Sequence, residues 1–422
     1  MHDVAHHRAV GNADALDSAR AGREHRRRRC AVMVALGIAL WPLPTFAHDP
    51  SAWGGLFRTR DGGATWSPAN AGSFVSGAIA LAVSPIDPHH LLLATDSGVS
   101  RSRNGGRDWE IEAPEVLVGP AFAVALDTDG RRALVSMGSA IFRNDGDGWR
   151  AIGAPGGAEP ARAFVAGLVP GRVYLAGWSG LYRSDDWATS WTRASDGLPA
   201  APVNALAVVP APGEGVFAIV AGRLWASFDG ARRWQPRDAG LPQGAVEAFT
   251  RESADPRHMW AAAAGQLFRS PDGGGQWQAS GRPLPERNTM ARGLAVSAPV
   301  ILVATARGVY RSHDGGERWE PPDENLPGHL EAGLLVRDPS SPSTIYAGFA
   351  VTGQDELRRR AAEGRSALMR LRMSDNLARG AAFFALLTLS AIVVLRHRVR
   401  SSYRTPQSEP APSEGGRAPR SR

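Results

Sequence analysis

Four glutamates stand at comparable places along the chain and could supply acid–base chemistry. They are Glu115, Glu159, Glu247 and Glu331. Two carboxylates that flank a glycosidic bond are the arrangement used by glycoside hydrolases, with one as the acid and the other as the base or nucleophile. Acidic loop residues are also ordinary solvated groups. A carbohydrate-active enzyme is therefore the alternative here and not the main prediction.

Histidine gives weaker grounds for chemistry. His89 and His90 are adjacent in the turn sequence DPHH, where neighbouring side chains point apart more often than they chelate one ion. His48 would become the first residue if the chain were cleaved after Ala47, and its amine and ring could then bind copper. Because partner histidines are not visible for either position, we expect no metal and no other cofactor.

The dominant pattern in the chain is a nine-residue box that recurs seven times. Its most complete copy is RSHDGGERW, residues 311–319. The tryptophans that end the boxes are 40 to 43 residues apart, which suits one propeller blade per repeat. Seven near-copies cannot all be one active site, so we interpret the boxes as structural. The residues assigned to them are Asp61, Trp66, Trp109, Asp186, Trp191, Asp229, Trp234, Asp272, Trp277, Asp314 and Trp319.

Short apolar segments surround each box. A run such as GLYR from Gly180 comes before the box, and two further runs joined by a Pro/Asp turn lie upstream, as in residues 79–95. Runs this short, bounded by Pro, Gly and Asp, are typical of strands. One repeat is therefore predicted to be four antiparallel strands, with the box at the hairpin between the third and fourth. There Gly315 and Gly316 permit positive φ, and Asp314 can accept hydrogen bonds from turn amides.

The two ends of the repeat region predict how the fold closes. The first box, which ends at Trp66, has no strand pair before it, and the last pair, which ends near Phe349, has no box after it. These halves would complete one blade between them and so remove exposed sheet edges. The predicted fold is all-β: a seven-bladed propeller of four-stranded antiparallel blades, closed by N- and C-terminal strands. Its strand pairs begin near Ile79, Phe122, Phe164, Asn204, Glu247, Arg292 and Gly333.

The boxes resemble those of the BNR or Asp-box repeat family, whose signature is S-x-D-x-G-x-x-W. Ser312, Asp314, Gly316 and Trp319 fill this signature, and the resemblance covers residues 54 to 350. Family members are β-propellers and include sialidases, some glucanases, sortilin-type receptors, and photosystem II assembly and stability factors. The resemblance implies the fold firmly, whereas it leaves the activity open.

A sialidase-like activity would need three converging arginines, a tyrosine nucleophile with an acid partner, and an aspartate acid/base. Tyr182 and Tyr310 are repeat residues of third strands, Tyr174 and Tyr346 fall in apolar second strands, and Tyr403 lies in the tail. None is placed as a nucleophile at the centre of the propeller. We therefore predict a non-catalytic member, nearest in kind to the assembly-factor branch.

One column of residues is expected at one end of the central channel. When the innermost strands are aligned, this column is apolar at Ile79 and polar or charged in other blades, which packing alone does not require. These residues are either ordinary solvated groups or a rim that docks a partner. The rim residues are Arg162, Asn204, Glu247 and Arg292, with Glu331 one residue off.

The charge and hydropathy of the two ends of the chain predict export and a membrane anchor. The formal net charge is +7, but the basic residues gather at the two ends, so we expect no nucleic-acid partner. A basic stretch, an apolar run and small residues at Thr45 and Ala47 predict a secretory signal. A second apolar run from Gly380 to Leu395 predicts a membrane helix. The arginines that follow it favour a cytoplasmic tail.

The predicted organisation is a signal sequence with a long basic n-region (1–47), a propeller (48–354), a basic juxtamembrane segment (355–378), a transmembrane helix (379–396) and a disordered tail (397–422). The propeller would lie in the periplasm, anchored to the inner membrane by this single helix. Cys30, the one cysteine, falls in the signal, so the mature chain would hold no disulfide. The expected partner is a protein of the membrane or envelope, with a glycan as the alternative.

Overall fold

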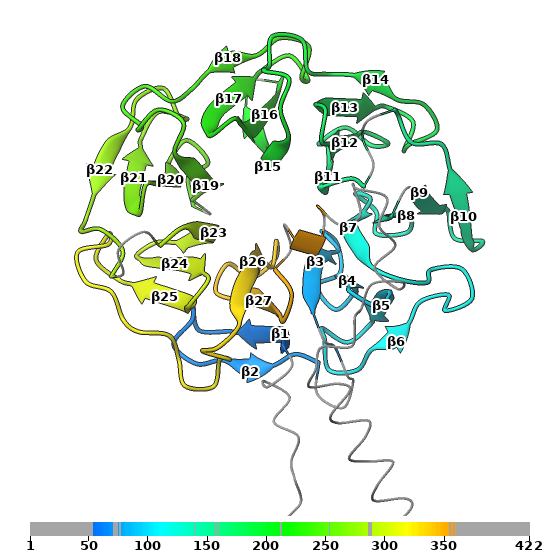
Figure 1. Cartoon of the computed structure of the whole chain (residues 1–422), viewed down its shortest axis with the longest axis horizontal. Helices are drawn as coiled ribbons and strands as arrows, with labels where there is room; N and C mark the ends of the chain where they lie inside the picture. Colours follow the sequence, from blue (N-terminus) through cyan, green and yellow to red (C-terminus); the bar gives the residue numbers. More distant parts are fainter. Residues whose placement is uncertain are drawn as a thin grey trace, which may run out of the picture.

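The computed structural model describes residues 54–359, apart from residues 71–74, 76, 139, 157, 159, 212, 253, 286–288, 354, 355 and 358. Within these residues the chain forms 27 strands in seven sheets, which are set around a central axis (Figure 1). This confirms the prediction of an all-β, seven-bladed propeller. The predicted signal, transmembrane helix and tail lie outside the described residues. The part of the chain that the structure describes contains no helix long and apolar enough to cross a membrane.

Five blades consist of four consecutive antiparallel strands, numbered outward from the axis. Blades 1 and 2 are β3 (Ala78–Val83), β4 (Leu91–Thr95), β5 (Val99–Ser102), β6 (Glu110–Ile111), β7 (Ala121–Leu126), β8 (Ala133–Met137), β9 (Ala140–Asn144) and β10 (Trp149–Ile152). Blade 3 is β11 (Ala163–Ala166), β12 (Val173–Ala176), β13 (Leu181–Ser184) and β14 (Thr192–Arg193). Blades 4 and 5 are β15 (Val203–Ala211), β16 (Gly213–Val220), β17 (Arg223–Ser227), β18 (Gln235–Pro236), β19 (Val246–Arg251), β20 (Met259–Ala263), β21 (Gln266–Ser270) and β22 (Gln278–Ser280).

Blade 6 departs from the predicted four strands. It holds β23 (Ala291–Ser297), β24 (Val300–Thr305) and β25 (Gly308–Ser312), and an isolated bridge between Arg311 and Glu320 replaces the fourth strand. Pro321 and Pro322 follow that bridge directly. Because proline has no amide hydrogen to donate, the ladder cannot continue past it.

Blade 7 is built from both ends of the propeller. It combines β26 (Glu331–Arg337) and β27 (Ile345–Ala350) with β1 (Gly54–Thr59) and β2 (Ser67–Pro68). Strand β1 pairs antiparallel with β27 along its whole length, from Gly54 opposite Ala350 to Thr59 opposite Ile345. The predicted closure is therefore confirmed, and it leaves no open sheet edge where the ends of the ring meet.

The apolar core is divided among the junctions between blades. Seven clusters of buried residues each span two adjacent blades, for example Phe217 of β16 with Met259 of β20. The second strand of a blade lies in the middle of its sheet with neighbours on both faces, and every residue of β4, β8, β20 and β27 is buried. Burial on this scale is the main stabilising term in the fold.

The boxes lie at the hairpins between third and fourth strands, and their side chains hold the turn. In blade 6, Ser312 Oγ donates to Asp314 Oδ1 and accepts the amide of Gly316, each at 2.9 Å. Asp314 Oδ1 in turn accepts the amide of Arg318 at 2.9 Å. In other blades the same hydrogen bond to the box hydroxyl is donated by the amides of Gly63, Gly106, Ala188, Ala231 and Gly274.

Two kinds of hydrogen bond connect several of the boxes with a neighbouring blade. Four box tryptophans donate the indole N–H to a carbonyl of the preceding blade, as from Trp277 to Arg237 at 2.7 Å and from Trp234 to Ala194 at 2.8 Å. In the other direction, a third-strand arginine reaches the next box, as from Arg183 to the carbonyl of Gly230 at 2.7 Å. The boxes therefore connect neighbouring blades in addition to stabilising the hairpin turns.

Candidate functional site

The inner strands begin on the face opposite to the boxes. In blade 5, Val246 at the start of β19 pairs with Ala263 at the end of β20. The start of an inner strand therefore lies beside the turn between second and third strands, whereas the box hairpin lies at the far end of the blade. We call the face that carries the inner-strand starts the ring face.

A β-bulge recurs at the second or third residue of the inner strand. The register shifts across one residue in β3, β7, β15, β19, β23 and β26. In blade 3, Arg162 stands directly before the first regular pair, Ala163 with Ala176, and its amide donates to Ala176 at 2.7 Å. A bulge leaves a residue outside the ladder and re-aims its side chain. These seven equivalent residues form the bulge ring: Ile79, Phe122, Arg162, Asn204, Glu247, Arg292 and Gly333.

Four of the five predicted rim residues belong to the bulge ring. Arg162, Asn204, Glu247 and Arg292 occupy it in blades 3 to 6, and Arg162 contacts Asn204 directly. Glu331 lies two residues before the ring member of blade 7 rather than one, at the start of β26. The inner strand of blade 3 begins at Ala163, one residue before the predicted Phe164. Alignment of the repeats with one another identified these equivalent positions. The pattern of apolar residues did not predict that a β-bulge lies there.

Arg162 is a buried contact between two blades and not an open surface group. Its side chain lies over the ring of Trp178, with 4.7 Å from guanidinium carbon to ring centroid. Its Nε donates to the carbonyl of Val203 at 3.0 Å, and its Nη2 donates to Asn204 Oδ1 at 3.2 Å. Arg162 is 8% exposed, whereas Asn204 is exposed. Arg162 therefore orients the amide that blade 4 presents to solvent.

The next blades are joined in the same direction around the ring. Glu247 accepts the amide of Ala291 at 2.7 Å, and partial burial raises the pKa of its carboxyl. Arg292 Nε lies 3.2 Å from Glu331 Oε1, with both side chains about one quarter to one third exposed. We call Arg162, Asn204, Glu247, Arg292 and Glu331 the polar arc; it presents both signs of charge.

The remaining ring residues are apolar or lack a side chain. Ile79 and Phe122 are 2% and 1% exposed, and they form a cluster with Leu357. Leu357 follows β27 in a short helical segment that lies near the axis beside β3 (Figure 1), and its amide donates to Gly353 at 3.1 Å. Leu357, which falls in the predicted juxtamembrane segment, thus packs on the propeller itself.

The other candidate residues are dispersed. Glu115 is exposed in the loop between blades 1 and 2, and Glu159 lies outside the described residues. His89 is exposed, while His90 contacts Arg101 at 2.5 Å, and burial together with that cation lowers its pKa. In the described part of the chain, no group of three His, Cys, Asp or Glu side chains is arranged to hold a metal ion.

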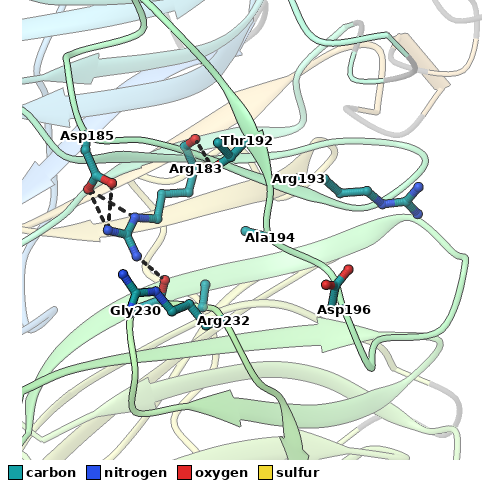
Figure 2. A pocket seen from close by; sticks show the side chains of 9 residues that line it. Arg183, Asp185, Thr192, Arg193, Ala194, Asp196, Gly230 and Arg232 are labelled. Atoms are coloured by element: carbon teal, nitrogen blue, oxygen red, sulfur yellow. Dashed lines mark hydrogen bonds and ion pairs between the residues drawn. The ribbon is translucent and has the colours of Figure 1, made fainter.

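A polar cavity that the sequence did not predict opens between blades 3 and 4, near the box of blade 4. It has a volume of about 370 Å³, and Figure 2 shows Arg183 lining it between Asp185 and Gly230. The guanidinium pairs with Asp185 at 2.6 Å and donates to the carbonyl of Gly230 at 2.7 Å. Arg193 and Arg232 line the same cavity. Arg183 is therefore engaged in joining the two blades.

Comparison with known proteins extends the fold assignment and leaves the activity open. No family model matches the chain, and no curated protein matches it. Among solved structures, the GH74 xyloglucanase from Xanthomonas campestris is similar at 21% identity and a TM-score of 0.50, over 67% of this chain and 54% of that one. The extracellular domain of a one component system from B. thetaiotaomicron gives 14% and 0.50, over 66% and 38%.

A third solved structure, described as YCF48 bound to D1 peptide, has 17% identity and a TM-score of 0.49, covering 65% of this chain and 94% of that one. At such identities a likeness reports the fold alone. The chain spans about half of the length of the xyloglucanase.

Proposed function

We propose that this protein is a membrane-anchored, extracytoplasmic propeller that binds a protein of the membrane or envelope and helps to assemble or stabilise it, without catalysis. The observation that carries the proposal is the bulge ring. The register shift is present in six blades, and Arg162 holds the equivalent place in blade 3, yet the seven positions bear six residue types. Since the bulge itself does not dictate those types, an exposed polar residue such as Asn204 is best explained by a partner that it contacts.

The polar arc suits a polypeptide better than a polyanion. Glu247 and Glu331 lie among the arginines, and they would repel an anionic ligand that the arginines attract. The exposed amide of Asn204 can donate and accept hydrogen bonds, as peptide groups require. The residues of the arc are also held by rigid strands, so the propeller itself would lose little conformational entropy when a segment binds.

The match of the boxes to the Asp-box signature supports membership of that family, and the apolar runs near the two ends of the sequence support export and anchoring. A reporter fused after Arg422 should behave as cytoplasmic in cells. Protease added from outside should cut the propeller and spare the tail. An externally accessible C-terminus would contradict this topology.

A carbohydrate-active enzyme remains the second candidate because of one observation. The pKa of Glu247 is raised by burial, as in a general acid, and Glu331 is a second carboxyl group of the same arc, paired with Arg292. A glycosidase uses two carboxyl groups, one of which acts as the acid. Both glutamates, however, already make contacts that join blades, which accounts for their positions without a substrate.

The deciding experiment is affinity capture from native membranes with the full-length protein, followed by binding of the identified protein in purified form. The double variant Asn204→Ala/Arg292→Ala should lose binding, whereas Arg232→Ala, which changes an exposed residue within the box of blade 4, should retain it. In parallel, the same preparations are tested for hydrolysis of sialosides and β-glucans. Turnover that Glu247→Gln abolishes would overturn the non-catalytic proposal.

A further inference from the structure

We propose that the bulge ring contains a binding site for a leucine-like side chain of a peptide, and that the chain's own C-terminal strap occupies this site as a displaceable ligand. The strap is the segment after β27 that includes Gly353, Glu356, Leu357 and Arg359. This inference rests on the proposed function and adds to it the chemical class of the partner segment.

The site itself consists of two bulge residues on neighbouring blades. Ile79 of β3 and Phe122 of β7 are 2% and 1% exposed, and Leu357 is the residue that clusters with them. Leu357 is separated from them in sequence by more than 200 residues and belongs to none of the seven clusters between blades. The contact is therefore an addition to a propeller core that is complete without it.

The composition of the ring matches the path of the strap. Ring residues are polar in blades 3 to 6, and they are apolar only in blades 1 and 2, where Leu357 lies. The strap leaves from blade 7, whose ring residue, Gly333, has no side chain, and Gly353 passes beside the carboxylate of Glu331. Large apolar residues at two water-facing bulges would be unfavourable if nothing covered them. The apolar sites are thus shaped for a segment that crosses from blade 7.

The contact is weak enough to be exchanged. The stabilisation gained by burying one leucine side chain would make the docked state about 10- to 100-fold more populated than the undocked state. Glu356 and Arg359, on either side of the leucine, pair with each other at 2.7 Å and are half exposed. An incoming segment with a leucine-like residue between an acidic and a basic group would reproduce this chemistry, and its charges would lie next to the polar arc.

The test replaces the single natural cysteine of the chain, so that one introduced thiol at a time can be measured. In a Cys30→Ser background, Leu357→Cys places a thiol at the docked position, and Val351→Cys places one on the same segment where the side chain is 59% exposed. Reaction with a maleimide should be at least tenfold slower for the Leu357→Cys protein. Adding Phe122→Ala should remove most of that protection. Equal rates for the two thiols would overturn the docking of the strap.

Displacement is tested with a synthetic peptide of residues 350–360, AVTGQDELRRR. A fluorescent form should bind the full-length Leu357→Asp protein at least tenfold more tightly than wild type, in which the strap competes at high effective concentration. A peptide with aspartate in place of the leucine should bind neither. Equal binding to both proteins, or binding to neither, would overturn the exchangeable site. Capture of a membrane protein through the polar arc could still succeed in that case, so the two proposals fail separately.

Discussion

At the box end of the blades the same side chains recur, whereas at the ring end they differ from blade to blade. Six hydroxyl groups, Thr59, Ser102, Ser184, Ser227, Ser270 and Ser312, accept an amide four residues later at 2.8 to 2.9 Å. The bulge ring repeats its backbone just as faithfully, yet it carries aliphatic, aromatic, basic, acidic, amide and glycine residues.

The difference follows from which atoms make each motif. The box turn is held by side-chain oxygens, so only a hydroxyl and an acceptor such as Asp or Asn complete its hydrogen bonds. A bulge is a main-chain feature, and it accepts almost any side chain. Repetition in this chain thus identifies structural residues, and variation at an equivalent site identifies side chains that the motif itself does not require.

The largest effect is expected at the best buried box tryptophan. Trp277 is 4% exposed, clusters with Phe217 and Met259, and donates to Arg237. Trp277→Ala should lower the free energy of unfolding by about 3 to 5 kcal/mol in denaturant titrations. Trp319→Ala should cost less, because that ring is partly exposed. A Trp277→Ala protein as stable as wild type would remove the structural role of the box end.

A smaller loss is expected at the arginine that joins blades 3 and 4. Arg183 donates to Gly230 and pairs with Asp185, and its side chain is 11% exposed. Since hydrogen bonds to charged groups contribute about 1.5 to 3 kcal/mol, Arg183→Ala should cost an amount in that range. Arg193→Ala, in the same cavity, is the matched control and should change stability by less than about 0.5 kcal/mol. Equal costs for the two would show that the bond to the box is unimportant.

The box aspartates should make the stability of the fold depend on pH in the acid range. Hydrogen bonds to the folded carboxylates of Asp61 and Asp186 lower the pKa of each from 3.8 to about 2. A pKa that is lower in the folded state stabilises it above pH 4, and this contribution is lost as pH falls from about 4 to 2. Asp186→Asn should flatten the loss of thermal stability in that window. An unchanged profile would mean that the carboxylate is not held as described.

The smallest stability effect is expected at the exposed ring residue. Asn204→Ala should change the free energy of unfolding by less than about 0.5 kcal/mol, as at ordinary surface sites, while it weakens partner binding. Arg162→Ala should cost more than this, because its guanidinium is buried against Trp178 and bonded to Val203. The predicted rim thus combines an exposed contact with a residue that positions it. Equal losses of stability would place both in the scaffold.

The sequence predicted the features that depend on repetition and missed those that depend on packing across blades. Box spacing gave seven blades and the pairing of β1 with β27. The third-strand arginines were visible as repeated letters, but their bond to the next box needs the geometry between blades. The docking of Leu357 on Ile79 and Phe122 joins residues that are far apart in the sequence, and no local pattern reveals such a contact.

The division between a structural box end and a binding ring end is tested most directly by one affinity measurement. The dissociation constant of the captured membrane protein is determined per folded molecule for Trp277→Ala and for Asn204→Ala/Arg292→Ala. We expect the first variant to be less stable but to bind like wild type, and the second to bind at least tenfold more weakly with nearly unchanged stability. The opposite pattern, with affinity lost at Trp277 and kept by the ring variant, would contradict this division of roles.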